Sequence, residues 1–270
     1  MKTSRFLSLS CAVLLTVVLA GCSGRSPGEF QGYIEGEYVY VASPLGGALA
    51  RLAVARGDSV KPGQLLFELE RQSEAAALDQ AQKNLAQAKA GEDMARSTYQ
   101  RRKELRETPS AVVSAEELDK ARTDHDTAVA QVAAQSAALD KAQWSFDQKQ
   151  QSAPTNAFVQ DTLYRQGEWV AAGNPVITLL PPENLKVRFF VPQEMLPKIK
   201  TGATVNVTFD GGTKTYSATV NYISAQAEFT PPVIYNRENR SKLVYMIEAK
   251  FSAADAPDLR PGQPVDVKLP

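Results

Sequence analysis

The sequence predicts an elongated, modular protein of mixed α and β structure, in which a small β domain is split by a long antiparallel helical hairpin and followed by a small β-barrel. Three observations lead to this prediction. A short β-rich motif occurs twice, a stretch of helix-forming residues separates its two copies, and the last third of the chain consists of short alternating segments.

The N-terminus, residues 1–21, has the pattern of a lipoprotein signal peptide. Lys2 and Arg5 precede an apolar run, Phe6 to Ala20, which is too short for a comfortable membrane span. The run leads into Leu-Ala-Gly-Cys, which resembles a bacterial lipobox. We therefore predict that Cys22 carries a lipid and becomes the mature N-terminus. The alternative is an ordinary signal peptide followed by an incidental cysteine.

Lipidation would decide where the chain resides. Several acyl chains at Cys22 would hold the protein durably on a bilayer, since each buried methylene contributes about 0.8 kcal/mol. The expected location is the periplasm, with the protein anchored to a membrane by its lipid. Ser23 favours the outer membrane by the usual sorting rule for such lipoproteins, whereas the function argued below favours the inner one. Residues 22–38 should form a tether, polar from Ser23 to Gln31, and the start of the barrel.

Two halves of the small β domain are expected at residues 39–70 and 152–180. Both contain Gly-acid-x-Val-x-x-Gly followed by alternating apolar residues, at a constant offset of 110 residues. The glycines of this motif are Gly57 and Gly63 in the first half and Gly167 and Gly173 in the second. Glycine fits tight turns that need a positive φ, and the alternation fits short half-buried strands. The halves can fold together only if the insertion between them returns to its start.

The insertion, residues 71–151, is expected to form an antiparallel coiled-coil hairpin. Its arms, Ser73 to Glu107 and Ser114 to Gln151, are rich in strong helix formers and lack internal proline, and Thr108-Pro109-Ser110 separates them. Each arm of roughly 35 residues would span about 50 Å. Helices packed into a compact bundle are the alternative, which the narrow apolar stripe of each arm argues against.

Heptad spacing marks the predicted seam between the two arms. In the first arm the seam is Leu78, Ala81, Leu85, Ala88, Glu92, Ala95 and Tyr99. In the second it is Leu118, Ala121, His125, Ala128, Val132, Gln135, Leu139, Ala142 and Phe146. Because alanine occupies many of these positions, we expect the helices to pack unusually closely.

Residues 181–270 are expected to form the β-barrel domain. The predicted strands cover Leu185 to Val191, Val205 to Phe209, Tyr216 to Tyr222, Leu243 to Ile247 and Val265 to Leu269. Asp210-Gly211-Gly212 and Pro261-Gly262 are turn signals between them. Pro192 to Lys200 is predicted as a short helix that closes one end of the barrel.

The succession of a lipobox, a split lipoyl-like motif, a coiled-coil hairpin and a β-barrel resembles the HlyD-type membrane fusion proteins, or periplasmic adaptors. The segment Ala225 to Ala249 is similar to the barrel of adaptors that accompany ABC-type exporters. The resemblance implies a non-catalytic subunit that bridges an inner-membrane exporter and an outer-membrane TolC-like channel and assembles as a homo-oligomeric ring. An adaptor of a proton-driven (RND or MFS) pump and a structural envelope lipoprotein without a pump remain alternatives.

The resemblance also implies a channel-docking tip at Arg101, Leu105 and Ser114. The family often has Ser seven residues after Leu, whereas here the spacing is nine, which makes the docking geometry different from the usual one. Ordinary solvated tip residues are the competing interpretation.

Other functional classes find little support. Basic and acidic residues balance at 30 each, which does not suggest nucleic-acid binding. A swinging carrier domain shares the lipoyl-like unit, but here the coiled coil replaces the hairpin that would hold the modified lysine. His125, the only histidine, lies on the predicted seam, and no metal or cofactor motif is apparent, so an enzyme is not expected.

Overall fold

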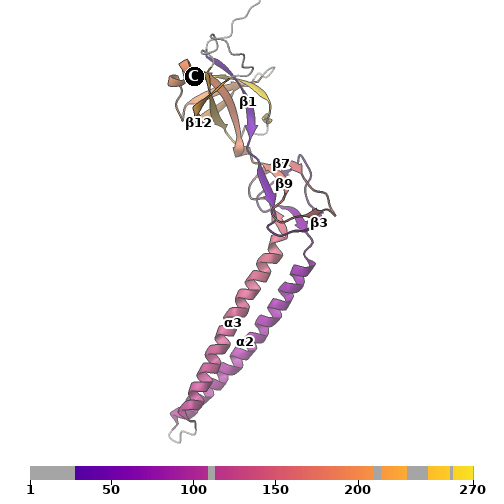
Figure 1. Ribbon diagram of the computed structural model, residues 1–270, viewed down its shortest axis with the longest axis vertical. Helices are drawn as coiled ribbons and strands as arrows, with labels where there is room; N and C mark the ends of the chain where they lie inside the picture. Colours follow the sequence, from indigo (N-terminus) through magenta and orange to yellow (C-terminus); the bar gives the residue numbers. More distant parts are fainter. Residues whose placement is uncertain (1–27, 109–112, 210–213, 230–242, 256–257, 270) are drawn as a thin grey trace, which may run out of the picture. The chain divides into compact units, whose positions relative to one another are not determined.

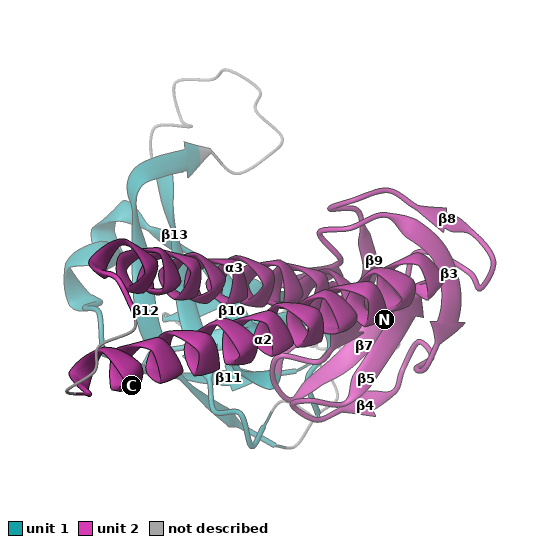
Figure 2. Ribbon diagram, turned by 90° about the horizontal axis from the view of Figure 1, so that it is seen from below, with its two compact units in different colours: residues 1–37, 182–270 teal, residues 38–181 magenta. Residues whose placement is uncertain are grey.

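A computed structural model describes residues 28–108, 113–209, 214–229, 243–255 and 258–269. The chain divides into two compact units, residues 1–37 with 182–270 and residues 38–181, which Figure 2 colours separately. The mixed α and β fold class predicted from the sequence is confirmed. Each unit is described by itself.

The second unit contains a β-sandwich and a helical hairpin. One sheet has the order β2 (Val39–Ala42), β9 (Pro175–Leu180), β7 (Ala157–Thr162), β4 (Ser59–Val60). The other has the order β6 (Gln150–Ser152), β5 (Leu65–Leu69), β3 (Gly47–Leu52), β8 (Trp169–Val170). Every strand in one sheet has its repeat mate at the same place in the other, so the sandwich has an internal two-fold relation. We call these sheet 1 and sheet 2.

The core of the sandwich comes from the inward positions of both sheets. Leu49, Phe67 and Leu69 of sheet 2 and Ile177 and Leu179 of sheet 1 are completely buried. Phe67, Leu69 and Leu179 are alternating apolar residues of the repeated motif, and Leu49 and Ile177 join them in the core. Burial of this core is the main source of the unit's stability.

The hairpin consists of α2 (Gln72–Glu107) and α3 (Ala115–Gln148), which run side by side and antiparallel (Figure 1). At 36 residues, α2 is about 54 Å long. The second arm ends earlier than the predicted Gln151, because Gln150–Ser152 form β6 and pair with β5. The sheet partner decides this boundary, and helix propensity alone could not reveal it.

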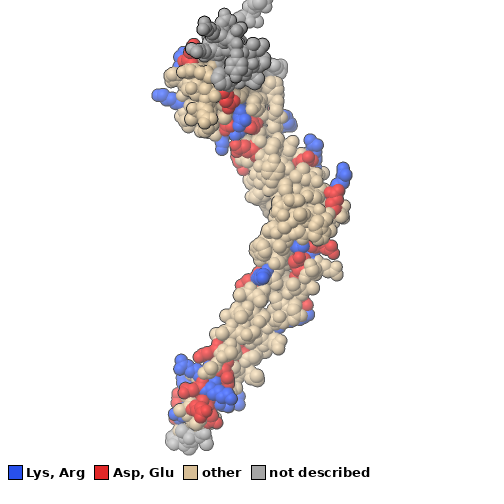
Figure 3. Space-filling model, viewed as in Figure 1, with Lys and Arg blue, Asp and Glu red and all other residues tan. Residues whose placement is uncertain are grey.

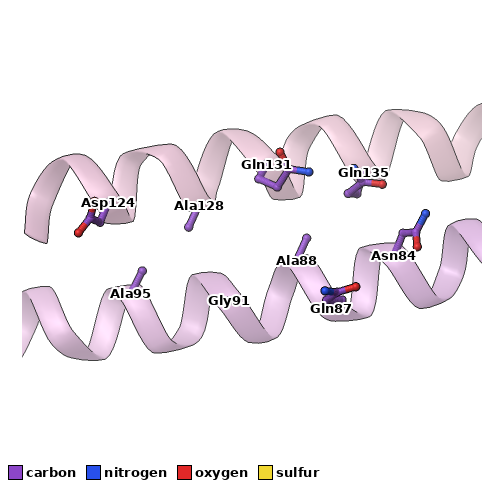
Figure 4. Close-up of a pocket in the computed structure, with 9 residues that line it drawn as sticks. All are labelled: Asn84, Gln87, Ala88, Gly91, Ala95, Asp124, Ala128, Gln131 and Gln135. Atoms are coloured by element: carbon purple, nitrogen blue, oxygen red, sulfur yellow. The ribbon is translucent and has the colours of Figure 1, made fainter.

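The predicted seam lies between the helices. Ala81 and Ala121 are buried, and the other seam positions are partly buried. The unusually close packing expected from the alanines stays a prediction, and in the middle of the hairpin the small seam residues border a hollow. Figure 4 shows Ala88, Gly91, Ala95 and Ala128 there, in a hollow of about 480 Å³ between the helices.

The first unit contains a closed six-stranded barrel in the order β1 (Glu29–Gly36), β10 (Leu185–Pro192), β13 (Leu243–Phe251), β12 (Tyr216–Phe229), β11 (Thr204–Thr208), β14 (Pro264–Lys268). The predicted short helix is the 3₁₀ helix η3 (Gln193–Lys198), and a second one, η2, spans Pro182–Asn184. Strand β1 begins at Glu29, within the predicted polar tether. Its backbone pairs with both β10 and β14 and so closes the barrel.

A cluster of charged side chains joins three neighbouring strands of the barrel. Lys186 and Arg188 on β10 each lie 2.7 Å from a carboxylate oxygen of Glu248 on β13, and Arg188 also lies 2.7 Å from Glu35 on β1. Burial opposes ionisation of Glu248, but the hydrogen bonds from Lys186 and Arg188 outweigh it, so the pKa of Glu248 lies below its usual value. The cluster fixes the register of these strands.

Candidate functional site

The turns of the repeated motif join the two halves of the sandwich. Gly57 and Gly167 have φ values of +93° and +91°, a conformation that side chains other than glycine rarely adopt. The amide of Gly57 donates to the carbonyl of Val159 at 2.9 Å. The amide of its repeat mate Gly167 donates to the carbonyl of Leu49 at 2.8 Å. Each turn is therefore held by the opposite half of the chain.

Gly63 and Gly173 make a second matched pair of contacts, both at a φ of +79°. The amide of Gly63 donates to Ala153 at 2.9 Å, and that of Gly173 donates to Ser43 at 2.8 Å. The four glycines named in the sequence thus stand at equivalent crossing points between the halves. The sandwich cannot form until the hairpin has brought residues 152–180 back to residues 39–70.

A buried ammonium holds the root of the hairpin against the sandwich. The Nζ atom of Lys149, just after α3, donates to the carbonyl of Gly46 at 2.7 Å and lies 3.0 Å from the carboxylate of Glu74 in the first turn of α2. Its side chain is only 7% exposed. One residue therefore contacts both helix ends and the β2–β3 connection.

Neighbouring groups complete this root. The hydroxyl of Ser43 donates to the carbonyl of Gln148 at 2.7 Å, and an added Cβ at Gly47 would lie 3.1 Å from the Lys149 ammonium. Burial opposes ionisation of Glu74, but hydrogen bonds from Lys149 and Ser73 outweigh it, so the pKa of Glu74 is lowered. Lys149 is not among the residues predicted from the sequence. A lone lysine between a glutamine-rich helix end and a strand gives no local signal.

At the other end of the hairpin, the predicted tip residues take two different roles. Arg101 and Leu105 lie one helical turn apart on α2, and both are exposed, Leu105 to 42%. Ser114 caps α3. Its hydroxyl accepts the amide of Glu117 at 3.2 Å, while the Glu117 carboxylate accepts the amide of Ser114 at 2.9 Å. The sequence Ser-x-x-Glu would have revealed this capping box.

Two further arginines tie the helices together near the tip. Arg102 donates to the carbonyl of Glu117 at 2.9 Å, and Arg106 donates to the carbonyl of Val113 at 3.0 Å. Arg101, which precedes Arg102 on α2, makes no hydrogen bond to the facing helix among the described residues, and its side chain is exposed. Charged side chains gather around this end of the hairpin (Figure 3). Pro109 and Ser110 lie outside the described residues.

His125 is part of the seam, as the heptad pattern predicted. Its ring stacks on Tyr99 with centroids 5.9 Å apart, and its Nε2 lies 3.6 Å from the carboxylate of Glu92 on the facing helix. The three side chains pack between α2 and α3.

The remaining predicted site residue, Cys22, lies outside the described residues, together with Ser23 and the whole signal segment. Among the helices that the structure does describe, none combines the length and apolar character needed to cross a membrane.

Three comparisons relate this chain to known proteins. Residues 77–149 match the family model "RND MFP, alpha-helical hairpin domain". The UPF0194 membrane protein YbhG of Salmonella arizonae is 28% identical over an alignment 330 positions long, which covers 100% of this chain and 98% of that protein.

Solved structures share the fold. The membrane fusion protein Spr0693 of Streptococcus pneumoniae R6 has a TM-score of 0.66 at 21% identity, with 90% of this chain and 98% of that one covered. MacA of Actinobacillus actinomycetemcomitans has a TM-score of 0.62 at 20% identity, with 91% and 81% covered. Together with the split sandwich and its two-helix insertion, these findings support the resemblance to the HlyD-type membrane fusion proteins, the periplasmic adaptors, that the sequence predicted.

Proposed function

We propose that this chain is the adaptor subunit of a multicomponent efflux or secretion system, bridging an inner-membrane ABC-type exporter and an outer-membrane TolC-like channel without catalysis of its own. The observation that carries the proposal is the hairpin. Its helices, 36 and 34 residues long, bury their apolar seam against each other. Their outer faces expose charged and polar side chains together with four large apolar ones, Met94, Leu105, Val129 and Trp144. Such an element suits a spacer between partners.

The ABC-type exporter is preferred because the segment Ala225 to Ala249 resembles the barrel of adaptors from such systems. A proton-driven pump of the RND class is the second candidate, favoured by the description of the hairpin model that residues 77–149 match. The barrel and the lipid-bearing end would lie toward the inner membrane in either case. A lipid at Cys22 would supply the attachment.

The channel contact is assigned to the tip. Arg101 and Leu105 present a cation and an apolar side chain on the same face of α2, and neither is used within the hairpin. Ser114 belongs to this contact only through its position, since its hydroxyl is engaged in capping α3.

Site-specific cross-linking in cells tests this proposal. A photoreactive amino acid is placed at Arg101 or Leu105, with Lys89 as the matched control because it is exposed in the middle of α2 without a partner among the described residues. We expect adducts with an outer-membrane channel from the two tip positions and none from Lys89.

Purification in mild detergent and mass spectrometry of the same cells identify the pump. Recovery of an ABC permease with its ATPase supports the proposal, and recovery of a proton-driven pump moves the chain to the second candidate. If the tip positions give no adducts and no pump is recovered, both adaptor candidates are contradicted, and a structural envelope lipoprotein is favoured.

A further inference from the structure

A hollow of about 490 Å³ lies on the outer face of sheet 2, at the foot of the hairpin. Sites for small molecules have volumes of roughly 300–1,000 Å³, so this hollow falls within their range. Its lining includes Gly46, Gly47 and Ala48 at the start of β3, the first turns of α2, and Trp169 on the edge strand β8. All of these residues belong to the second unit, so the hollow exists within one chain.

Three outward side chains form a row across this hollow. Ala48 of β3 lies opposite Trp169 of β8, and its carbonyl accepts the backbone amide of Glu70, just after β5, at 2.8 Å. All three residues line the hollow. Neighbouring strands are about 4.8 Å apart, so the backbones at Glu70 and Trp169 are about 10 Å apart, with an alanine between them. A ligand above Ala48 would therefore contact an indole on one side and a carboxylate on the other.

The internal repeat shows that the fold does not require this arrangement. At an offset of 110, the corresponding row on sheet 1 consists of Ser59, Phe158 and Leu180, which pair in the same order. The middle residue there is a phenylalanine, and the counterpart of Glu70 is the buried Leu180. The small residue and the carboxylate are therefore particular to sheet 2.

The charge of the hollow is that of one carboxylate. The ammonium of Lys149 also lines it but lies 3.0 Å from the carboxylate of Glu74, so these two charges compensate each other. Arg71, next to Glu70, lies 2.7 Å from the carboxylate of Glu68. Glu70 itself is exposed and forms no ion pair and no side-chain hydrogen bond among the described residues. The hollow therefore carries an uncompensated negative charge.

The indole of Trp169 is the second group that favours a cation. Its side chain is 70% exposed, and the face of a tryptophan attracts cations more strongly than that of any other side chain. Within the described part of the chain, the cations that lie over aromatic rings are Arg71, over Phe146, and Lys214, over Tyr216. The face of Trp169 is thus open to a cation from outside the chain.

We propose that this hollow binds an amphipathic organic cation, whose aromatic or alkyl part stacks on Trp169 above Ala48 and whose charged group faces Glu70. An inorganic cation does not suit the site, because one carboxylate and an indole do not supply the oxygen ligands that such ions need. The inference does not rest on the proposed function, since a site of this kind would operate with either class of pump or with none.

Binding of ethidium, a planar aromatic cation, to the full chain in a non-ionic detergent tests the inference. The fluorescence anisotropy of the dye should rise to saturation with added protein, after subtraction of the signal in detergent alone. The anionic dye 8-anilinonaphthalene-1-sulfonate is the charge control. Its dissociation constant should be higher by about fivefold or more, because its sulfonate meets the Glu70 carboxylate.

Substitutions in the row should weaken ethidium binding. Glu70→Gln keeps the shape and removes the charge, so it should raise the dissociation constant about threefold or more. Trp169→Ala removes the aromatic face and Ala48→Leu fills the hollow, and each should raise it about fivefold or more. The matched controls are Glu104→Gln, an exposed carboxylate on α2, and Tyr40→Ala, an aromatic side chain that is 62% exposed on β2. Both should change it less than about twofold.

The indole signals provide a site-specific readout. The chain has two tryptophans, so a nitrogen–proton correlation spectrum contains two indole N–H signals, which Trp144→Phe assigns. Ethidium should shift the signal of Trp169 and leave that of Trp144 in place, although the Trp144 side chain is 51% exposed on α3.

Saturable binding that needs both Glu70 and Trp169 supports the assignment. Unchanged binding in Glu70→Gln and Trp169→Ala, or equal shifts of both indole signals, would show that ethidium adsorbs elsewhere and would overturn it. Equal affinity for the anionic dye, or no binding of ethidium at all, would overturn it as well. Because Glu70→Gln alters only an exposed group, an unchanged far-UV circular dichroism spectrum separates its effect from a loss of folding.

Discussion

Replacing Lys149 with methionine is expected to loosen the root of the hairpin. In the wild type, the Lys149 ammonium lies 3.0 Å from Glu74, and the two side chains are 7% and 19% exposed. Methionine retains the apolar stem but leaves the Glu74 carboxylate and the Gly46 carbonyl without their donor. Removing one partner of a buried pair costs about 3–5 kcal/mol. Because Glu74 reaches solvent in part, we expect a loss at the lower end, about 3 kcal/mol.

Thermal unfolding followed by far-UV circular dichroism measures this loss. At about 2–4 °C per kcal/mol for a chain of this size, the midpoint should fall by about 6–12 °C. The matched control is Lys83→Met, which removes an i,i+4 pair with Asp79 whose side chains are 69% and 59% exposed. An exposed pair contributes at most about 0.5 kcal/mol, so this midpoint should move by less than about 2 °C.

Acid provides an independent check. The pKa of Glu74 is lower in the folded chain than its usual value of 4.5, so its contribution to stability is present above about pH 4.5 and is lost as the pH falls through the lowered value. Lys149→Met should remove this part of the pH dependence. Equal midpoints for the Lys149→Met and Lys83→Met variants, or an unchanged acid profile, would refute the role assigned to the root.

Three further predictions concern the turns, the tip and the barrel. Gly57→Val and Gly167→Val should each lower the free energy of unfolding by at least about 1–2 kcal/mol, because valine is strained at positive φ. Gly91→Ala is the control inside α2, where an added Cβ meets nothing within 4 Å, and it should raise the free energy of unfolding by about 0.5–1 kcal/mol. Denaturant titration measures all three changes. Ser114→Ala should lower the stability of the hairpin by about 1 kcal/mol through loss of the helix cap, whereas Ser114→Asp should keep the cap and the stability. If channel cross-linking survives in Ser114→Asp, the hydroxyl of Ser114 is not needed for docking. Glu248→Gln should destabilise the barrel by about 3 kcal/mol. It should also remove the part of the loss of stability below about pH 4.5 that comes from Glu248, since the pKa of this group is lowered in the folded chain. An unchanged acid midpoint would contradict this.

Elements with strong local periodicity could be predicted from the sequence. The seam positions, the barrel strands and the short helix η3 follow from spacing alone, because amphipathic period and turn residues act within a few positions of one another. The start of β1 was missed because a polar edge residue such as Glu29 looks like linker until its barrel partners are known. The hollow beside Gly91 was missed because small seam residues permit close packing without enforcing it.

The candidate site was predictable to a lesser degree. Arg101 and Leu105 were found through family resemblance, and the structure leaves both exposed. The capping role of Ser114 could have been found from Glu117 three residues later. The root of the hairpin could not be predicted from the sequence. Its contacts join three separate segments, which contain Gly46, Glu74 and Lys149 and meet only when the helices pack on the sandwich.

The sequence by itself determined that two β halves enclose a helical hairpin, because the repeat at an offset of 110 and the heptad seam are both written in local residue patterns. Only the tertiary structure decided which strands pair, which charged side chain is buried at the root of the hairpin, and which residues lie on the outer face of each sheet. The physical reason is that each strand could form backbone hydrogen bonds, and each apolar residue could be buried, with many different partners. One arrangement is selected only when the whole chain packs and excludes water from its core.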